Sequence, residues 1–403
     1  MANFPKKGEF IAIVAMTIAT IAFAIDAMLP ALPELTAEFS PDAPNRVQLI
    51  VTMFVLGMGI GTLFTGPLSD AFGRKPVLLG GSLLYILCAT AALWAQSLEA
   101  VLIARFFQGL GAAAPRVVAL AIVRDRYAGR GMAQIMSFVM IVFTLVPAIA
   151  PLLGSQLVAL GGWHAVFLAF AVFSFVVSGW LAVRLPETLE PENRMPFRVA
   201  QLRAALTEMM ALPMVRLSIV AQAFCYGVLF SMISTVQPVY DGFFGRAETF
   251  PLWFGAIAIA ASSASFLNAA LVMRLGMRLL VTAMLIAQVG LTLAILCLFA
   301  VGLSGDALFY AFVVWQVGVF FQAGLTLGNL NALAMEPVGH IAGLAASVIG
   351  ALSTVGAVIL AVPVSLAFDG TPVPVAIGIL LQVIGALVAL HRMRRLERAV
   401  TTP

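Results

Sequence analysis

The sequence predicts an all-α membrane protein with twelve transmembrane helices, and two observations carry this prediction. First, 62% of the 403 residues are hydrophobic and only 10% are charged, with a mean hydropathy of +1.07, whereas soluble domains carry about 25% charged residues. Second, the apolar residues form continuous runs of about the 20 residues that a spanning helix needs. A transmembrane β-barrel would instead show alternating polar and apolar residues. The sequence therefore excludes a water-soluble fold and favours helices.

Twelve apolar segments follow one another along the chain. The first is preceded by Lys6 and Lys7 and is long enough to cross a membrane, so we interpret it as a span and not as a cleavable signal. The segments run near residues 10–30, 47–69, 76–96, 99–123, 132–158, 163–184, 213–238, 249–273, 277–301, 305–331, 340–367 and 372–391.

The basic residues predict the orientation of these segments, because lysine and arginine gather in cytoplasmic loops. If the N-terminus is cytoplasmic, only Arg46 and Arg246 fall outside, Arg105 and Arg116 lie within a span, and every other lysine and arginine falls inside. Both termini are therefore predicted to be cytoplasmic. The isoelectric point near 9.2 is explained by these topology signals, and no nucleic-acid partner is expected.

The longest polar interruption divides the spans into six and six. We expect a six-helix half at 1–184, a cytoplasmic connector at 185–212, a second six-helix half at 213–391 and a basic tail at 392–403. This arrangement is typical of transporters built from two related halves around a midplane site. The stretches "GPLSDAFGRKPVLLGG" and "MRLGMRLLVT" form a degenerate internal echo. The tail could bind anionic lipid or serve only as a topology anchor.

The loop "GPLSDAFGRKP", residues 66–76, combines features suited to a tight turn at the membrane surface. Gly66 permits close packing at a helix end, and Gly73 turns the chain. Asp70 suits a helix N-terminus or a basic partner, and Arg74 anchors the loop on the inner side. An ordinary cytoplasmic loop is the alternative interpretation.

This loop resembles the signature between helices 2 and 3 of the major facilitator superfamily. "LIARFFQGLGAA" resembles the helix 4 motif of that family, with Arg105 as its intramembrane arginine. "IDAMLPALP", "FSMISTVQPVY" and "AGLAASVIGAL" resemble helices 1, 7 and 11 of the twelve-helix drug:proton antiporters, in their bicyclomycin and phenicol resistance (Bcr/CflA) branch. The resemblance implies two six-helix halves around a central cavity, alternating access, and a monomer in the bacterial inner membrane.

The resemblance also implies roles for residues that change conformation. Asp70 would latch the two halves together, with Arg124 and Asp125 as its charged partners, although Ala71 stands where the family has a basic residue.

The antiporter motif of helix 5 is only partly kept. Pro151 and Gly154 match it, Ile141, Ala150 and Ser155 replace its glycines, and Pro147 adds a second bend. Export is therefore less strongly implied than membership in the family.

Asp26 is the only acidic residue that we place well inside a span. An ionisable group in a membrane is costly and indicates function by default. Asp26 and Arg105 lie at similar depth if helices 1 and 4 run in opposite directions, so Arg105 is expected either to pair with Asp26 or to set the field around it. Alternatively, Asp26 only caps a helix break before Pro30.

The expected mechanism is proton coupling at Asp26. Desolvation disfavours the ionised form of a carboxylate, and a nearby arginine favours it. A site balanced between the two can load and release a proton as its solvation changes. Proton and substrate would then compete, and the proton gradient would drive export without a cofactor.

Arg116 follows Arg105 by 11 residues, three helical turns, so both face the same side. Two arginines against one acid favour neutral, zwitterionic or anionic substrates. The alternative is that Arg116 reaches toward the headgroups.

Five further residues are candidates for a largely apolar substrate cavity with a few orienting polar groups. For each of them, polar packing between helices is the alternative. They are Gln222, Tyr226, Phe230, Trp315 and Gln316.

The function expected from these observations is a proton-coupled multidrug efflux antiporter for small neutral or anionic compounds such as phenicols and bicyclomycin. A proton-coupled uptake symporter and a dedicated metabolite exporter are the alternatives. An enzyme is not expected, because the sequence shows no nucleophile–base set, nucleotide loop or metal-ligand cluster. The expected partners are the small-molecule substrate, protons and membrane lipids.

Overall fold

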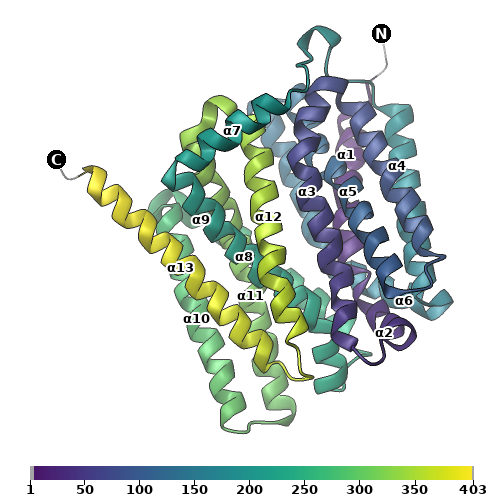
Figure 1. The fold of residues 1–403 in the computed structure, drawn as a ribbon, viewed down its shortest axis with the longest axis vertical. Helices are drawn as coiled ribbons and strands as arrows, with labels where there is room; N and C mark the ends of the chain where they lie inside the picture. The colour runs from purple at the N-terminus through teal and green to yellow at the C-terminus, as the bar shows by residue number, and fades with distance from the viewer. Residues whose placement is uncertain (1–3, 402–403) are drawn as a thin grey trace. The chain divides into compact units, whose positions relative to one another are not determined.

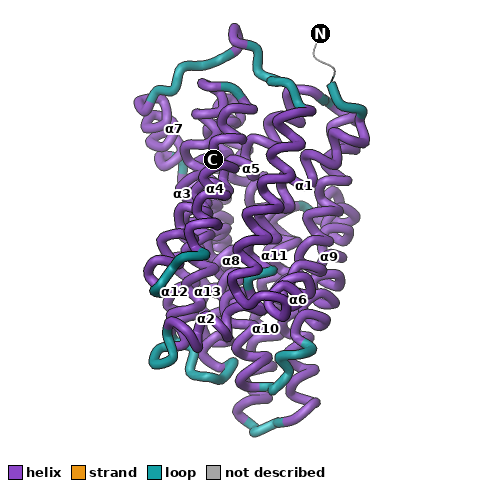
Figure 2. Tube along the Cα trace, turned by 90° about the vertical axis from the view of Figure 1, so that its right-hand side faces the viewer, coloured by secondary structure: helices purple, strands orange, loops and turns teal. Residues whose placement is uncertain are grey.

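The computed structural model describes residues 4–401, and the side chains of residues 133, 140, 143, 144 and 397–401 lie outside the description. Every regular element within residues 4–401 is helical, and Figure 2 shows these helices joined by loops without a strand. The expected all-α fold is confirmed. The chain divides into two compact units, Met1–Val199 and Ala200–Pro403.

The first unit contains five long helices joined by shorter elements (Figure 1). Its helices are α1 (Lys7–Asp26), η1 (Leu29–Ala31), α2 (Leu32–Phe39), η2 (Pro44–Gln48), α3 (Leu49–Phe72), α4 (Arg74–Ala92), α5 (Leu98–Arg126), α6 (Gly129–Arg184) and η3 (Pro191–Asn193).

The second unit contains six long helices, and α7 leads into it from the last residue of the first unit. Its helices are α7 (Val199–Ala211), α8 (Pro213–Pro238), η4 (Val239–Phe243), α9 (Phe250–Leu275), α10 (Met277–Ala300), α11 (Gly305–Met335), η5 (Glu336–Ile341), α12 (Ala342–Leu366) and α13 (Val373–Thr401).

Ten helical stretches in the described chain are long and apolar enough to cross a membrane, so this is a multi-pass membrane protein. Two of them coincide with pairs of predicted spans. Helix α6 has 56 residues, roughly 84 Å at 1.5 Å per residue, and leaves helical geometry at Gly161 and Gly162. The stretch Gly305–Leu366 has 62 residues and contains the break at η5. Divided at these breaks, the helices match the twelve predicted segments.

Close packing at two glycines brings α5 directly against α3. A Cβ atom at Gly57 would lie 1.9 Å from the carbonyl oxygen of Phe106, and one at Gly109 would lie 1.9 Å from that of Phe54. Small residues allow such backbone contact between membrane helices. Gly109 lies one turn after Arg105 on α5, so this contact places the arginine beside the first turn of α3.

Candidate functional site

Asp26 is the last residue of α1 and is only 5% exposed. Helix α1 ends here because η1 follows, with Pro30, which has no N–H to continue the ladder. Within residues 4–401 the carboxylate of Asp26 has no hydrogen-bond or ion-pair partner among the described groups. A buried polar group without a partner is costly, which makes Asp26 the first candidate for a functional carboxylate.

Arg105 is fully buried on α5 and joins three helices. Its Nη2 donates to the carbonyl oxygen of Ala24 on α1 at 3.0 Å, and its Nε donates to that of Ile50 on α3 at 3.2 Å. Its Nη1 donates to Oε1 of Gln108 at 2.9 Å. The guanidinium also lies 4.3 Å from the ring centroid of Phe54, a distance typical of cation–π contacts.

The structure corrects one of the two expectations for Arg105. In the described part of the chain it forms no ion pair with Asp26 and instead binds the backbone two residues earlier. The last carbonyl groups of a helix lack intrahelical partners, so the end of α1 offers the Ala24 oxygen to a cation. Arg105 is therefore near the Asp26 turn without neutralising its carboxylate, and its influence on the field there stays a prediction.

Gly154 brings α6 against the same turn. A Cβ atom at Gly154 would lie 2.3 Å from the carbonyl oxygen of Ala27, which is closer than any side chain tolerates. The glycine that matches the antiporter motif thus borders the candidate proton site. Pro147 and Pro151 lie inside α6, which stays helical through both of them, and their part in conformational change stays a prediction.

Two acidic residues that sequence reasoning missed lie near the point where α6 is interrupted. Glu34 accepts the backbone N–H of Trp163 at 2.8 Å, and Glu38 accepts its indole N–H at 2.6 Å. Gly162 adopts φ 65° just before this point, a conformation that favours glycine. The carboxylate of Glu34 therefore accepts a backbone N–H at the start of the second half of α6, where no intrahelical acceptor is available.

The signature loop is organised around Arg74, which is nearly buried. Its Nε donates to Oδ2 of Asp125 at 2.9 Å, and its Nη1 donates to Oγ of Ser69 at 2.9 Å and to Oδ1 of Asp70. Ser69 in turn donates to the carbonyl oxygen of Gly66 at 2.9 Å. One guanidinium thus joins the end of α3, the start of α4 and the end of α5.

The expected pairing of Asp70 with Arg124 and Asp125 is wrong within the first unit. Asp70 pairs with Arg74, and Asp125 binds the same guanidinium from α5. The side chain of Arg124 is exposed and forms no hydrogen bond or ion pair with another described residue. Neighbouring residues on a helix point about 100° apart, so only one of Arg124 and Asp125 can face Arg74.

Glu187 completes this network, although it lies 113 residues from Arg74 along the chain. Its carboxylate accepts the backbone N–H groups of Arg74 at 2.9 Å and Lys75 at 3.0 Å, the donors that a helix N-terminus leaves unsatisfied. Gly73 has φ 103°, and a Cβ there would lie 2.8 Å from Oε2 of Glu187. The glycine therefore serves both the turn and the approach of the carboxylate.

The connector after α6 continues the same association. The backbone N–H of Met195 donates to the carbonyl oxygen of Asp70 at 3.0 Å, and Oγ1 of Thr188 donates to Oδ2 of Asp125 at 3.0 Å. Part of the predicted cytoplasmic connector is thus folded onto the signature loop. No local sequence signal identifies this contact.

Two of the predicted cavity residues in the second unit lie in contacts between helices. Gln222 donates to the carbonyl oxygen of Leu327 at 3.3 Å and accepts from Ser353 at 2.6 Å. Trp315 donates its indole N–H to Thr292 at 3.0 Å. Such contacts correspond to the helix-packing alternative, and a role in binding substrate stays a prediction for these residues.

The remaining candidates are one further residue in a contact between elements, two aromatic residues on one helix face, and Arg116. Gln316 accepts from the hydroxyl of Tyr240 at 2.9 Å. Tyr226 and Phe230 lie on one face of α8 with ring centroids 6.0 Å apart and planes inclined by 11°. Tyr226 is half-buried. Arg116 is half-buried directly after Pro115 on α5, so its two alternatives both stay predictions.

Comparison with known proteins places these features in a family. The model of the Major Facilitator Superfamily matches residues 14–361. A bicyclomycin resistance protein homolog of Haemophilus influenzae is 30% identical over 370 residues, covering 90% of this chain and 91% of that protein. A chloramphenicol resistance protein of Pseudomonas aeruginosa is 30% identical over 338 residues, covering 79% and 74% of the two chains.

Solved structures show the same fold at low identity. The D-xylose-proton symporter has a TM-score of 0.74 at 13% identity, covering 95% of this chain and 97% of that one. The human organic anion transporter MFSD10 (TETRAN) has a TM-score of 0.65 at 18% identity, covering 96% and 100%.

Proposed function

This chain belongs to the Major Facilitator Superfamily, and we propose that it exports small neutral or anionic compounds in exchange for protons. The family consists of transporters. Two relatives carry names of resistance to bicyclomycin and to chloramphenicol, which supports drugs of these two kinds as substrates. We place it as a monomer in the bacterial inner membrane, with both termini cytoplasmic and no cofactor.

The observation that carries the proposal is the buried, unpartnered carboxylate of Asp26. Burial disfavours its ionised form and a nearby cation favours it, so a change in hydration can shift the balance. Among the charged groups on neighbouring elements, Arg105 of α5 binds the Ala24 carbonyl, and Glu34 and Glu38 of α2 are both bound to Trp163. Asp26 thus keeps a carboxylate that is available to take up a proton.

The direction of exchange follows from alternating access. When the site opens outward, water reaches Asp26 and protonates it. When it opens inward, the proton leaves and substrate takes its place. Arg105, and Arg116 if it faces the cavity, give the site an excess of positive charge, which disfavours organic cations.

Asp26→Asn tests proton coupling directly. The purified protein is placed in proteoliposomes with an internal pH dye and a proton gradient, and chloramphenicol, bicyclomycin and a cationic dye are added in turn. We expect a neutral drug to release protons through the wild type and not through Asp26→Asn, while Asp42→Asn, at an exposed acid, behaves as wild type. Coupled transport by Asp26→Asn would refute the role of Asp26.

The same assay separates export from uptake. Drug moving against the proton flux supports the antiporter, and substrate moving with it supports the symporter alternative, for which the incomplete helix 5 motif leaves room. A response only to the cationic dye would contradict the charge argument.

Gly154→Ala tests whether α6 must touch the Asp26 turn. The added Cβ would overlap the Ala27 carbonyl, and we expect the exchange rate to fall at least about tenfold, since overpacking costs about 1–3 kcal/mol. Gly179→Ala is the matched control on the same helix, because its Cβ would meet nothing within 4 Å. Equal rates for the two variants would refute the close contact.

A further inference from the structure

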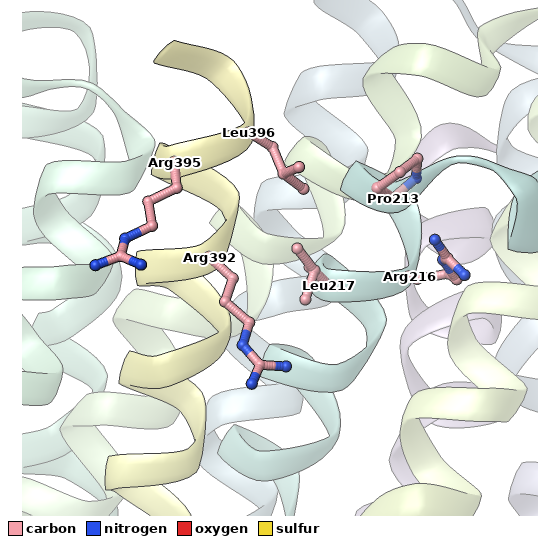
Figure 3. Close-up of a pocket in the computed structure, with 6 residues that line it drawn as sticks. All are labelled: Pro213, Arg216, Leu217, Arg392, Arg395 and Leu396. Carbon is pink, nitrogen blue, oxygen red and sulfur yellow. The ribbon is translucent and has the colours of Figure 1, made fainter. Parts of the chain in front are cut away.

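A groove of about 410 Å³ lies between the first turns of α8 and the C-terminal end of α13. Figure 3 shows Arg392, Arg395 and Leu396 projecting from α13, with Leu396 and Leu217 of α8 directed into the space between the helices. Pro213 and Arg216 of α8 complete the lining. Three of the six lining residues are therefore arginines, and none is acidic.

The three arginines have no acidic partner among the side chains that the structure describes. Arg216, Arg392 and Arg395 are exposed, and within residues 4–401 none of them forms a hydrogen bond or ion pair with another described group. Their neighbour Arg394 differs, because its Nη2 donates to Thr282 on α10 at 3.4 Å. Three guanidinium groups thus lie at the groove, and Figure 3 shows that of Arg392 pointing from α13 toward α8. The planar donors of a guanidinium suit phosphate oxygens.

The length of α13 places these arginines at a membrane surface. Its apolar run extends from Val373 to about His391. At 1.5 Å per residue this is roughly 27 Å, close to the thickness of the hydrocarbon core. Arg392 and Arg395 follow directly and so fall at the depth of the lipid headgroups.

An exposed apolar stripe leads along α13 to the groove. Its members recur at intervals of four, three and four residues, which places them on one face of the helix. Arg392 and Arg395 follow at the next intervals of four and three. The stripe consists of Ile377, Leu381, Ile384 and Val388.

On α8, exposed Val220 lies one turn after Arg216. On α13, the exposed apolar stripe ends at Arg392 and Arg395.

We propose that this groove binds the headgroup phosphate of an anionic phospholipid. Arg392, which points toward α8 in Figure 3, takes the phosphate, and Arg216 and Arg395 add positive charge at the rim of the groove. Leu217 and Leu396 contact the glycerol backbone and the first methylene groups. The acyl chains lie along the exposed stripe of α13. A lipid fits this groove better than a soluble anion, because the cations stand at the end of an apolar face. The site is separate from Asp26 and does not depend on which compound is exported.

Lipid binding to the purified full-length protein in detergent tests the proposal. Native mass spectrometry measures the binding of dioleoyl phosphatidylglycerol and of dioleoyl phosphatidylcholine to wild type and to R216Q/R392Q/R395Q. We expect saturable binding of phosphatidylglycerol that is at least about tenfold weaker in the triple variant, since each arginine near an anionic surface contributes roughly fivefold. Phosphatidylcholine should bind weakly to both proteins.

Two control variants separate this site from general attraction. R203Q/R274Q removes two exposed arginines elsewhere in the second unit and should leave binding unchanged, whereas R392K/R395K keeps the charge and should retain most of it. Unchanged affinity in the triple variant, or an equal loss in R203Q/R274Q, would overturn the proposal. Displacement of the lipid by millimolar inorganic phosphate would show a soluble phosphate site and overturn the assignment to a lipid.

Discussion

Two loops, one in each unit, have the same backbone turn and different surroundings. Gly73 links α3 to α4 with φ 103° and ψ 159°, and Gly276 links α9 to α10 with φ 79° and ψ 152°. Each glycine donates its N–H to the carbonyl oxygen four residues earlier, at 3.1 Å and 2.9 Å. A Cβ at Gly73 would meet Glu187 and Arg194, while one at Gly276 would meet nothing within 4 Å.

The comparison shows that the same backbone turn can occur in different surroundings. Both positions need glycine, because other residues rarely adopt these angles. The turn in the first unit is surrounded by the ion pairs of Arg74 and the carboxylate of Glu187, whereas Arg278 beside the second turn is influenced electrostatically by Glu336 and Arg394. The weak sequence echo between the two loops thus corresponds to shared backbone geometry.

The largest expected difference between the loops is at their arginines. Arg74→Ala would leave Asp70 and Asp125 beside each other without their cation, and we expect a loss of about 3 kcal/mol in the free energy of unfolding, at the lower end for a broken buried pair. Arg274→Ala, at an exposed arginine next to the second turn, should change it by less than about 0.5 kcal/mol. Denaturant unfolding in detergent measures both, and equal losses would remove the distinction between the loops.

Alanine at the two glycines gives a smaller difference. Gly73→Ala and Gly276→Ala both force a side chain into a strained backbone conformation, at about 1–3 kcal/mol each. Gly73→Ala should cost about 1 kcal/mol more, because its Cβ also displaces the Glu187 carboxylate. The same unfolding measurement applies. A greater loss in Gly276→Ala would show that space around Gly73 is not limiting.

Glu187→Ala should have the smallest effect. It removes the carboxylate that caps α4, and losing such a cap costs about 1 kcal/mol. Hydrogen exchange should accelerate at the amides of Arg74 and Lys75, which donate to Glu187. The matched control is Glu190→Ala, at an exposed acid three residues away. Unchanged exchange in Glu187→Ala would contradict the cap.

Much of the fold and part of the candidate site could be predicted from local patterns. The apolar runs predicted the spans, since each span needs its own hydrophobic length. Asp26 and Arg105 were recognisable because charged residues stand out in such runs. Their burial agrees with that prediction. The bond from Arg105 to Ala24 was not predictable, because it depends on which carbonyl groups the end of α1 leaves open.

Partners across the chain escaped sequence reasoning for a related reason. Glu187 and Arg74 are distant in sequence, and nothing near Glu187 marks it as the cap of α4. Asp70 pairs with Arg74 and not with the expected Arg124. This outcome depended on the direction in which the last side chains of α5 point. The hydrogen bonds of Gln222 and Trp315 depended on which helices neighbour α8 and α11.

The sequence by itself determined the helical membrane fold, the number of spans, the turn glycines and the presence of a carboxylate and an arginine within the apolar segments. These follow from hydrophobic length and backbone conformation, which are local properties. Only the tertiary structure decided which groups those charges contact and which stay without a partner. That choice depends on how the helices pack, because hydrogen bonds and ion pairs form only between groups that packing brings within about 3 Å of each other.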